Sequence, residues 1–193
     1  MKGVLTKFSK SQPIHVLLLG LRGSGKTLLL YKTFLPKWDT AAAEIEPTIL
    51  YHYEEVKYSN KTLGIWDFSG DPMIRNVPNF MSRQINTSAI VFVVNILDMN
   101  DASNREIFEW ISLLESEESL LESCFVILLN GTRDIAQGKA FQNFMIQVEQ
   151  LKSRMGARFL CKGINATLAL KDPGWVTALD FIISHSSKSN TKN

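Results

Sequence analysis

The chain has 193 residues, of which 45% are hydrophobic and 21% charged, and its formal net charge is +2. This length is typical of one domain with a substantial core, and the composition excludes a wholly disordered chain. The small net charge, without a basic stripe of interleaved aromatic residues, excludes a nucleic-acid partner. Cys124 and Cys161 lie in apolar surroundings at no metal-ligand spacing, as reduced thiols of an intracellular protein do.

The chain contains no apolar run of the ~18 residues that a membrane-spanning helix needs. Its first dozen residues are mixed and mostly polar, unlike a signal peptide, and residue 2 is not glycine, which excludes N-myristoylation. We therefore expect a cytoplasmic protein. Any peripheral membrane contact would be weak or indirect and would depend on the N-terminal extension, residues 1–12.

Hydrophobic patterning predicts alternating strands and helices over residues 13–184, followed by a disordered polar tail at 185–193. Asp98 and Asp101 are candidate caps for the helix that ends near 118. In chain order we expect strand 14–19, helix 26–34, strands 49–58 and 62–68 around a turn at 59–61, a loop with helical pieces over 73–85, strand 89–95, helix 101–118, strand 124–129, helix 141–156, strand 158–164 and a helix after 174.

This order predicts an α/β fold with a six-stranded, mostly parallel sheet and helices on both faces. The short connection at 59–61 makes strands 49–58 and 62–68 an antiparallel hairpin, so one strand runs against the others. Ligands of such sheets lie at the carboxyl ends of the parallel strands. The loops after the first, third, fifth and sixth strands should therefore face one ligand.

The segment Gly20–Thr27 reads G-x-x-x-x-G-K-T between the first strand and the first helix. Such a loop curls its backbone N–H groups around phosphate oxygens, and the helix N-terminus adds its positive end. Lys26 can reach the outer phosphates, and the Thr27 hydroxyl can ligate Mg²⁺. The segment predicts a nucleoside-triphosphate site whose phosphate-binding residues are Gly20, Arg22, Gly23, Ser24, Gly25, Lys26 and Thr27.

A second acidic motif, Asp67-Phe68-Ser69-Gly70, follows the hairpin. A strand-ending aspartate is often only a turn former. After a phosphate-binding loop and a hairpin, we expect Asp67 to hold Mg²⁺ through water and the Gly70 N–H to meet the γ-phosphate.

Together, Gly20–Thr27, Pro47-Thr48-Ile49 and Trp66-Asp67-x-x-Gly70 resemble the Arf/Arl family of small GTPases, over about residues 15–183. The resemblance implies a P-loop NTPase of the Ras-like small G-domain type that binds GTP and GDP with Mg²⁺ as a molecular switch. It also implies that Thr48 closes on Mg²⁺ and the γ-phosphate only in the GTP state. The hairpin, roughly 50–66, would shift its register as the nucleotide changes.

Three departures from the family pattern affect catalysis. The family's glutamine, which orients the attacking water, falls on Asp71, whose negative charge opposes that role beside a phosphate. Ser69 replaces a glycine, which restricts the backbone. Arg22 lies at a position near the γ-phosphate, where it could act as a built-in arginine finger, crowd the water out or face solvent. We expect slow hydrolysis unless a partner supplies the missing group.

The base-recognition loop is also altered. The family reads guanine with N-K-x-D, and here Asn130-Gly131-Thr132-Arg133-Asp134 keeps the aspartate but not the lysine. We expect Asp134 to select guanine, with Asn130 and Thr132 beside it. Counting back from Gly174 places Ala169 where the family uses a backbone N–H on the base carbonyl.

The positions that match the family's partner-binding surface are aromatic or apolar: Tyr51, Trp66, Phe80 and Met81. We expect a monomeric G domain that recruits an effector protein through this surface and meets an exchange factor and an activating protein there; Trp66 could instead pack under the switch. The alternative is a pseudo-GTPase, a structural or scaffold subunit that holds nucleotide permanently or not at all. A nucleotide kinase would share the phosphate-binding loop, but the hairpin after residue 48 argues against it.

Overall fold

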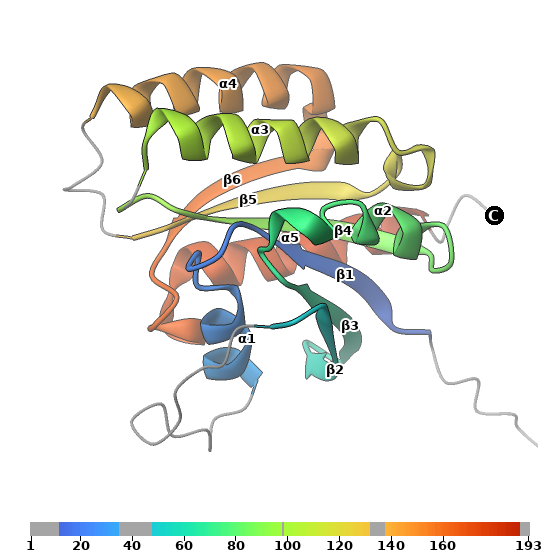
Figure 1. The fold of residues 1–193 in the computed structure, drawn as a ribbon. Coiled ribbons are helices and arrows are strands. Elements are labelled where there is room, and N and C mark those ends of the chain that lie inside the picture. The colour runs from blue at the N-terminus through green and yellow to red at the C-terminus, as the bar shows by residue number, and fades with distance from the viewer. Residues whose placement is uncertain (1–11, 35–47, 98, 132–137, 190–193) are drawn as a thin grey trace, which may run out of the picture.

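The computed structural model describes residues 12–34, 48–97, 99–131 and 138–189. They form a six-stranded sheet in the order β2-β3-β1-β4-β5-β6, in which β2 and β3 are antiparallel and the other neighbours parallel (Figure 1). The α/β architecture predicted from the alternating pattern is confirmed. The strands are β1 Ile14–Leu19, β2 Tyr51–Tyr58, β3 Lys61–Phe68, β4 Thr87–Asn95, β5 Cys124–Asn130 and β6 Phe159–Ile164.

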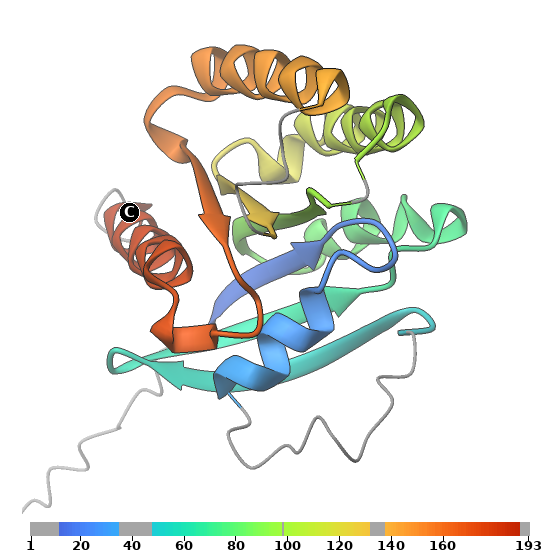
Figure 2. The same cartoon turned by 90° about the vertical axis from the view of Figure 1, so that its left-hand side faces the viewer.

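Helices cover both faces of the sheet. Figures 1 and 2 show α1 and α5 on one face, and α2, α3 and α4 on the other. The helices are α1 Lys26–Phe34, α2 Val77–Ser82, α3 Asp101–Glu115, α4 Lys139–Met155 and α5 Pro173–Ser189. Short 3₁₀ helices are η1 Pro72–Ile74, η2 Glu118–Leu120, η4 Gly156–Arg158 and η5 Ala169–Lys171.

The central strands are apolar throughout because side chains on both of their faces are buried. In β1, Leu17 and Leu19 belong to the core beneath α3 and α4, whereas Val16 and Leu18 belong to the core beneath α1 and α5. Strands β4 and β5 contribute to the same two cores. Because neighbouring side chains of a strand point to opposite faces, such strands lose the alternation of a half-exposed strand.

The β2–β3 hairpin closes through two residues. Ser59 and Asn60 have φ values of 45° and 62°, and Tyr58 pairs with Lys61. Two successive positive φ angles are typical of the type I′ turn, whose twist matches that of antiparallel strands. The predicted turn included Lys61, which instead begins β3.

Helix α3 begins and ends differently from the prediction. Its N-cap is Asn100, whose side chain accepts hydrogen bonds from the backbone N–H groups of Ala102 and Ser103. Asp98 lies outside the described residues, and Asp101 is the first residue of the helix. The helix ends at Glu115 instead of near 118 because Glu118–Leu120 forms the separate turn η2.

The tail predicted from residue 185 is wrong for residues 185–189, because α5 continues to Ser189. The Ser186 hydroxyl is buried and donates to the carbonyl of Ile183, one turn earlier. Serine hydroxyls that bond back to the helix can satisfy themselves within it, so a serine-rich composition does not exclude a helix. Among the described helices, none is both long and apolar enough to cross a bilayer.

Candidate functional site

The phosphate-binding loop predicted at Gly20–Thr27 connects the end of β1 to the start of α1. Gly20 and Gly25 have φ values of 141° and 92°, in the region that side chains disfavour. A Cβ on Gly20 would overlap the carbonyl of Val93, and one on Gly25 would overlap the side-chain amide of Asn130. The loop therefore needs glycine at both positions, for conformation and for space.

This loop forms one wall of a cavity of about 360 Å³. The opposite wall comes from the end of β3 and from Thr48, so the cavity lies at the carboxyl ends of β1 and β3, as predicted. Its lining residues are Arg22, Gly23, Ser24, Gly25, Lys26, Thr27, Leu28, Thr48, Phe68, Ser69 and Gly70.

Lys26 is buried at the base of the cavity. Its Nζ donates to the carbonyl oxygens of Gly20 at 2.9 Å and Leu21 at 3.1 Å, and to the Ser24 hydroxyl at 3.4 Å. Burial lowers the pKa of Lys26 to about 8, against the opposing effect of the Asp67 carboxylate. An anion in the cavity would favour the ammonium form and offset this burial.

We expect nucleotide binding to take up protons near pH 8. A lysine with a pKa of about 8 is half deprotonated there, and a bound phosphate requires the charged form, so uptake should reach about half a proton per nucleotide. Calorimetry in buffers of different ionisation enthalpy measures this number. Lys32→Ala, further along α1, should leave the uptake unchanged, and a buffer-independent enthalpy at pH 8 would contradict the prediction.

Thr27, which lines the cavity, contacts the buried Asp67 at the end of β3. The Thr27 hydroxyl donates to Asp67 Oδ2 at 2.6 Å. Asp67 is fully buried, and its other oxygen, Oδ1, has no hydrogen-bond partner. Burial raises the pKa of Asp67, and Thr27, Lys26 and His52 act in the opposite direction.

This donor set fits Mg²⁺. The ion prefers oxygen ligands and in nucleotide sites uses one or two protein groups together with phosphates and water. A buried carboxylate oxygen without a partner beside a threonine hydroxyl offers such ligands. No group of three or more acidic, histidine or cysteine residues suited to a metal occurs among the described residues, so a purely protein-held site is not present there.

The residues after β3 lie directly on the phosphate-binding loop. A Cβ on Gly70 would overlap the backbone of Leu21 and Arg22. Next to it, Arg22 Nη2 donates to Asp71 Oδ2 at 3.2 Å. Asp71 Oδ1 accepts from the backbone N–H of Met73 and caps η1. Two of the three residues that depart from the family pattern near the outer phosphates, Arg22 and Asp71, are thus ion-paired with each other.

Gly70→Ala should lower the free energy of unfolding by about 1–3 kcal/mol, because the added methyl must displace backbone rather than a flexible side chain. The matched control is Gly138→Ala, since a Cβ on Gly138 would meet nothing within 4 Å. Denaturant unfolding of both variants measures the difference. Equal effects of the two substitutions would show that Gly70 does not need this close approach.

Of the residues predicted to bind the base, Thr132 and Asp134 lie outside the described residues. Asn130 donates through Nδ2 to the carbonyl of Ser24 at 3.0 Å and accepts at Oδ1 from the N–H of Ala166 at 3.0 Å. It therefore joins the phosphate-binding loop to the loop after β6.

Ala169 lies in η5, whereas Ala166 is the alanine beside the phosphate-binding loop. A Cβ on Gly25 would lie 3.7 Å from that of Ala166. The assignment of Ala169 stays a prediction, and Ala166 is a second candidate for the same contact. Ala166 could have been found from the rule that ligands lie at the carboxyl ends of strands, because it follows β6 closely.

Comparison with known proteins agrees with this geometry. The model of the ADP-ribosylation factor family matches residues 1–185. The chain belongs to the Arf family. It is 30% identical over 187 residues to ADP-ribosylation factor-like protein 1 of Drosophila melanogaster, covering 94% of this chain and 96% of that one.

Other Arf-family relatives are similarly distant. The yeast (Saccharomyces cerevisiae) ADP-ribosylation factor-like protein 1 is 27% identical over 177 residues, covering 91% of this chain and 89% of that one. In fold, the chain resembles the Arl6 BBS3 small GTPase of Trypanosoma brucei, solved with the nucleotide analogue GppNp. That match has a TM-score of 0.72 at 19% identity and covers 92% of this chain and 99% of that one, which confirms the small G-domain fold.

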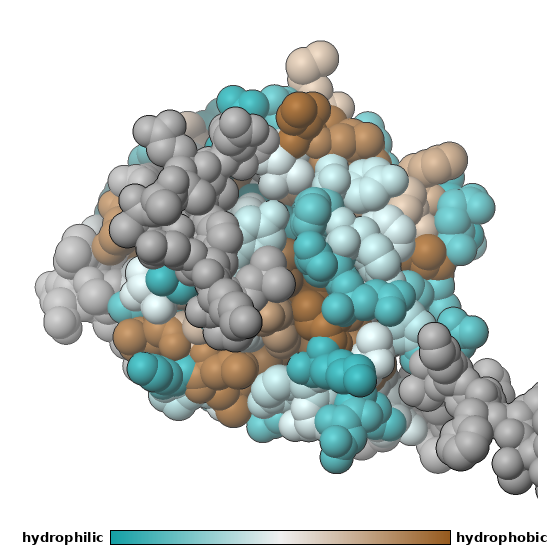
Figure 3. Space-filling model, turned by 90° about the horizontal axis from the view of Figure 1, so that it is seen from below, coloured by the Kyte–Doolittle hydropathy of each residue, from teal (hydrophilic) through white to brown (hydrophobic). Residues whose placement is uncertain are grey.

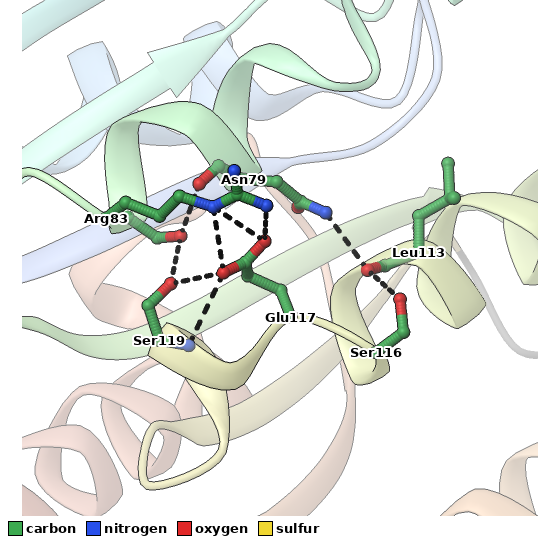
Figure 4. Close-up of polar contacts among 7 residues, drawn as sticks. Asn79, Arg83, Leu113, Ser116, Glu117 and Ser119 are labelled. Carbon is green, nitrogen blue, oxygen red and sulfur yellow. Dashed lines mark hydrogen bonds and ion pairs between the residues drawn. The ribbon is translucent and has the colours of Figure 1, made fainter.

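In this Arf-family domain, the segment after β3 is anchored at its far end by polar contacts that sequence patterns did not indicate. Arg83, at the end of α2, donates to both carboxylate oxygens of Glu117 (Figure 4). The hydroxyls of Ser82 and Ser119 lie 2.6 Å apart, and Asn79 donates to the carbonyl of Leu113. Arg83 holds the pKa of Glu117 below its usual range.

The expected partner-binding residues of the Arf-family domain differ in exposure. Phe80 is 62% and Tyr51 41% exposed, whereas Met81 is partly buried against the core beneath α3. Trp66 is also partly buried: its ring centroid lies 4.4 Å from that of Tyr53, and its Nε1 donates to His15. Trp66 thus packs against Tyr53 of the hairpin, against His15 of β1 and against the core beneath α3.

Apolar side chains beyond the predicted set are exposed nearby, with Ile49 at 92% and Met73 at 93%. Seen from the side of α1 and β2, hydrophilic residues lie between the hydrophobic ones on the part of the surface that is not grey (Figure 3).

Proposed function

We propose that this Arf-family protein is a guanine-nucleotide switch that binds GDP and GTP with Mg²⁺. The proposal is carried by one observation: Lys26 and Thr27 line a single cavity together with the glycine-rich loop, and the Thr27 hydroxyl donates to the buried Asp67 carboxylate. Backbone N–H groups and a lysine suit phosphates, and the adjoining oxygens suit the cation that accompanies them.

On binding, Lys26 would exchange its bonds to Gly20, Leu21 and Ser24 for the outer phosphate oxygens. Thr27 and Asp67 would hold Mg²⁺, Asp67 through water, and this ion neutralises charge on the outer phosphates. Thr48, which lines the cavity, would complete the ligands in the GTP state. Gly70 would offer its N–H to the γ-phosphate.

Hydrolysis should be slow. Asp71 is held by Arg22 and by the Met73 N–H, and the negative charge of a carboxylate in that place is repelled by the γ-phosphate, which opposes the water-orienting role. Arg22, paired with Asp71, is not poised as a finger in this conformation. A partner that supplies a water-orienting group would be needed for rapid turnover.

For the base, we propose that Asp134 selects guanine, with Thr132 and Asn130 beside it. Ala166, which lies beside the phosphate-binding loop, is a second candidate for the contact assigned to Ala169. Because Asn130 ties the base-side loop to Ser24, base and phosphate binding would be mechanically connected.

The nucleotide state would be read by an effector on the surface formed by Tyr51, Phe80 and the partly buried Trp66 and Met81. An exchange factor and an activating protein would act on the same segments. We propose a monomeric, cytoplasmic protein whose peripheral membrane contact, where it occurs, depends on residues 1–12.

A binding titration tests the proposal. Nucleotide-free protein in Mg²⁺ is titrated with GDP, with a non-hydrolysable GTP analogue and with ATP. We expect both guanine nucleotides to bind, and ATP to bind at least about 100-fold more weakly, because a carboxylate paired to the wrong base leaves polar groups unsatisfied. Absence of a preference for guanine nucleotides would refute the switch. Permanent occupancy by one nucleotide would instead support the pseudo-GTPase alternative.

A further inference from the structure

We propose that the ion pair of Arg22 and Asp71, hereafter the rim pair, sets the preference of this protein for GTP relative to GDP. The inference rests on the proposed nucleotide-binding function and concerns the outer-phosphate end of the same cavity. Arg22 belongs to the phosphate-binding loop and Asp71 to the segment after β3, so the rim pair bridges the two walls of the cavity at 3.2 Å.

The packing of Gly70 places the rim pair next to the third phosphate. Gly70 lies so close to the backbone of Leu21 and Arg22 that even a methyl group would not fit. The outer phosphates lie between the lysine and the metal ligands of such a site, here Lys26 and the Thr27–Asp67 pair. A diphosphate ends before this point, whereas a third phosphate extends toward the rim pair.

The two members of the rim pair differ in how firmly they are held. The Asp71 carboxylate caps η1 by accepting from the Met73 N–H at 2.9 Å, and the Asp71 N–H donates to the Ser69 hydroxyl at 3.3 Å. The Arg22 side chain is 67% exposed and can turn without uncovering buried surface. When a third phosphate enters, Arg22 is therefore the group that moves.

The charges around the cavity define the competition. Arg22 and Lys26 are the cations among the described residues that line it, and Lys26, at the base of the cavity, would bind a phosphate that GDP and GTP share. A third phosphate adds negative charge beside the Asp71 carboxylate and competes with it for Arg22. GDP leaves the rim pair intact. Asp71 thus disfavours GTP, and Arg22 favours it once released.

Two single variants test this directly. Asp71→Asn keeps the oxygen that caps η1 but removes the charge, and should raise the ratio Kd(GDP)/Kd(GTP analogue) about three- to fivefold, the upper part of the range for an exposed ion pair. Arg22→Gln should lower the same ratio by about the same factor, because the third phosphate loses its cation. Both side chains are exposed or half-buried on the surface, so neither change empties the core.

The double variant Arg22→Gln/Asp71→Asn shows whether Asp71 acts through Arg22. If Asp71 opposes GTP by holding Arg22, the effect of Asp71→Asn should fall below about twofold in the Arg22→Gln background. An effect of Asp71→Asn that is equal in both backgrounds would mean direct repulsion of the phosphate and would overturn the rim pair as the cause.

The matched control is Glu115→Gln, which removes the carboxylate of the Arg154–Glu115 pair. That pair has an N···O distance of 2.8 Å and side-chain exposures of 56% and 24%, against 67% and 29% for the rim pair. Each protein is titrated with GDP and with the non-hydrolysable GTP analogue at fixed Mg²⁺. Support requires a shifted ratio for Asp71→Asn and none for Glu115→Gln.

An unchanged ratio in Asp71→Asn overturns the inference while leaving the proposed function intact. Failure of the unaltered protein to bind either guanine nucleotide overturns the proposed function itself, and the rim pair with it. The two failures are therefore distinguishable in one set of titrations.

Discussion

Replacing Lys26 with alanine should weaken the binding of GDP and GTP about 100-fold or more. Truncating one partner of a buried, hydrogen-bonded charge pair costs about 2–5 kcal/mol, and 1.4 kcal/mol corresponds to tenfold in affinity. Lys26 is buried at the base of the cavity, where water cannot replace its ammonium group beside a phosphate.

The fold should survive this substitution. Burial lowers the pKa of Lys26 to about 8, so below that pH the side chain is charged and its burial destabilises the folded, nucleotide-free protein. Losing it removes this penalty as well as the bonds to Gly20, Leu21 and Ser24. The two effects oppose each other, so the melting temperature of the nucleotide-free variant should change little.

Thermal unfolding with and without GDP and Mg²⁺ makes the test. The unaltered protein should be stabilised by ligand, whereas Lys26→Ala should not. Lys32→Ala, on the same helix but outside the cavity lining, should keep the full ligand-induced shift. If GDP and Mg²⁺ raised the melting temperatures of Lys26→Ala and Lys32→Ala equally, the assignment of Lys26 to the phosphates would be wrong.

The fold was predictable from sequence where the signal is local and repeated. The apolar runs of β1, β4 and β5 indicate strands buried on both faces, and the short connection near 59–61 indicates a hairpin. Element ends were less predictable because side chains decide them by bonding to the backbone. Asn100 rather than an aspartate caps α3, and Ser186 bonds back within α5.

The candidate site also has parts that the sequence predicts and parts that it does not. The phosphate-binding loop is one continuous segment, so spacing alone identifies Lys26 and Thr27. The rim pair joins residues 49 positions apart, and the Arg83–Glu117 contact joins residues 34 apart. No pattern along the chain encodes which surface arginine meets which carboxylate. The assignment of Ala169 depends on counting back across a loop of assumed length, whereas Ala166 is located by the end of β6.

Asp67→Asn should abolish most of the effect of Mg²⁺ on nucleotide affinity. Asparagine keeps an oxygen that can accept from the Thr27 hydroxyl but loses the negative charge that would hold the cation through water. Loss of a group that orients a metal's ligands typically lowers affinity about 10–100-fold. We therefore expect the ratio of GDP affinity in Mg²⁺ to that in a chelator to approach one.

The same substitution should stabilise the nucleotide-free protein. Burial raises the pKa of Asp67, so the folded state binds protons more tightly than the unfolded state, and stability falls as pH rises through the folded-state pKa. At neutral pH the buried carboxylate is therefore a destabilising group, and Oδ1 has no partner. Asp67→Asn has no titrating carboxylate, so it should not lose this stability as the pH rises.

Unfolding in denaturant at pH 7 and pH 5, paired with GDP titrations in Mg²⁺ and in chelator, measures both effects. Asp180→Asn is the control, because that carboxylate is exposed on α5 and accepts from the Tyr58 hydroxyl. We expect Asp67→Asn to raise the free energy of unfolding without ligand and to weaken Mg²⁺-dependent GDP binding. This combination would show that the carboxylate serves to bind the cation rather than to stabilise the fold. A variant that is less stable and whose GDP affinity still depends on Mg²⁺ would show that Asp67 is a structural residue. In that case the carboxylate would stabilise the fold through its hydrogen bond from Thr27 and would not bind the cation.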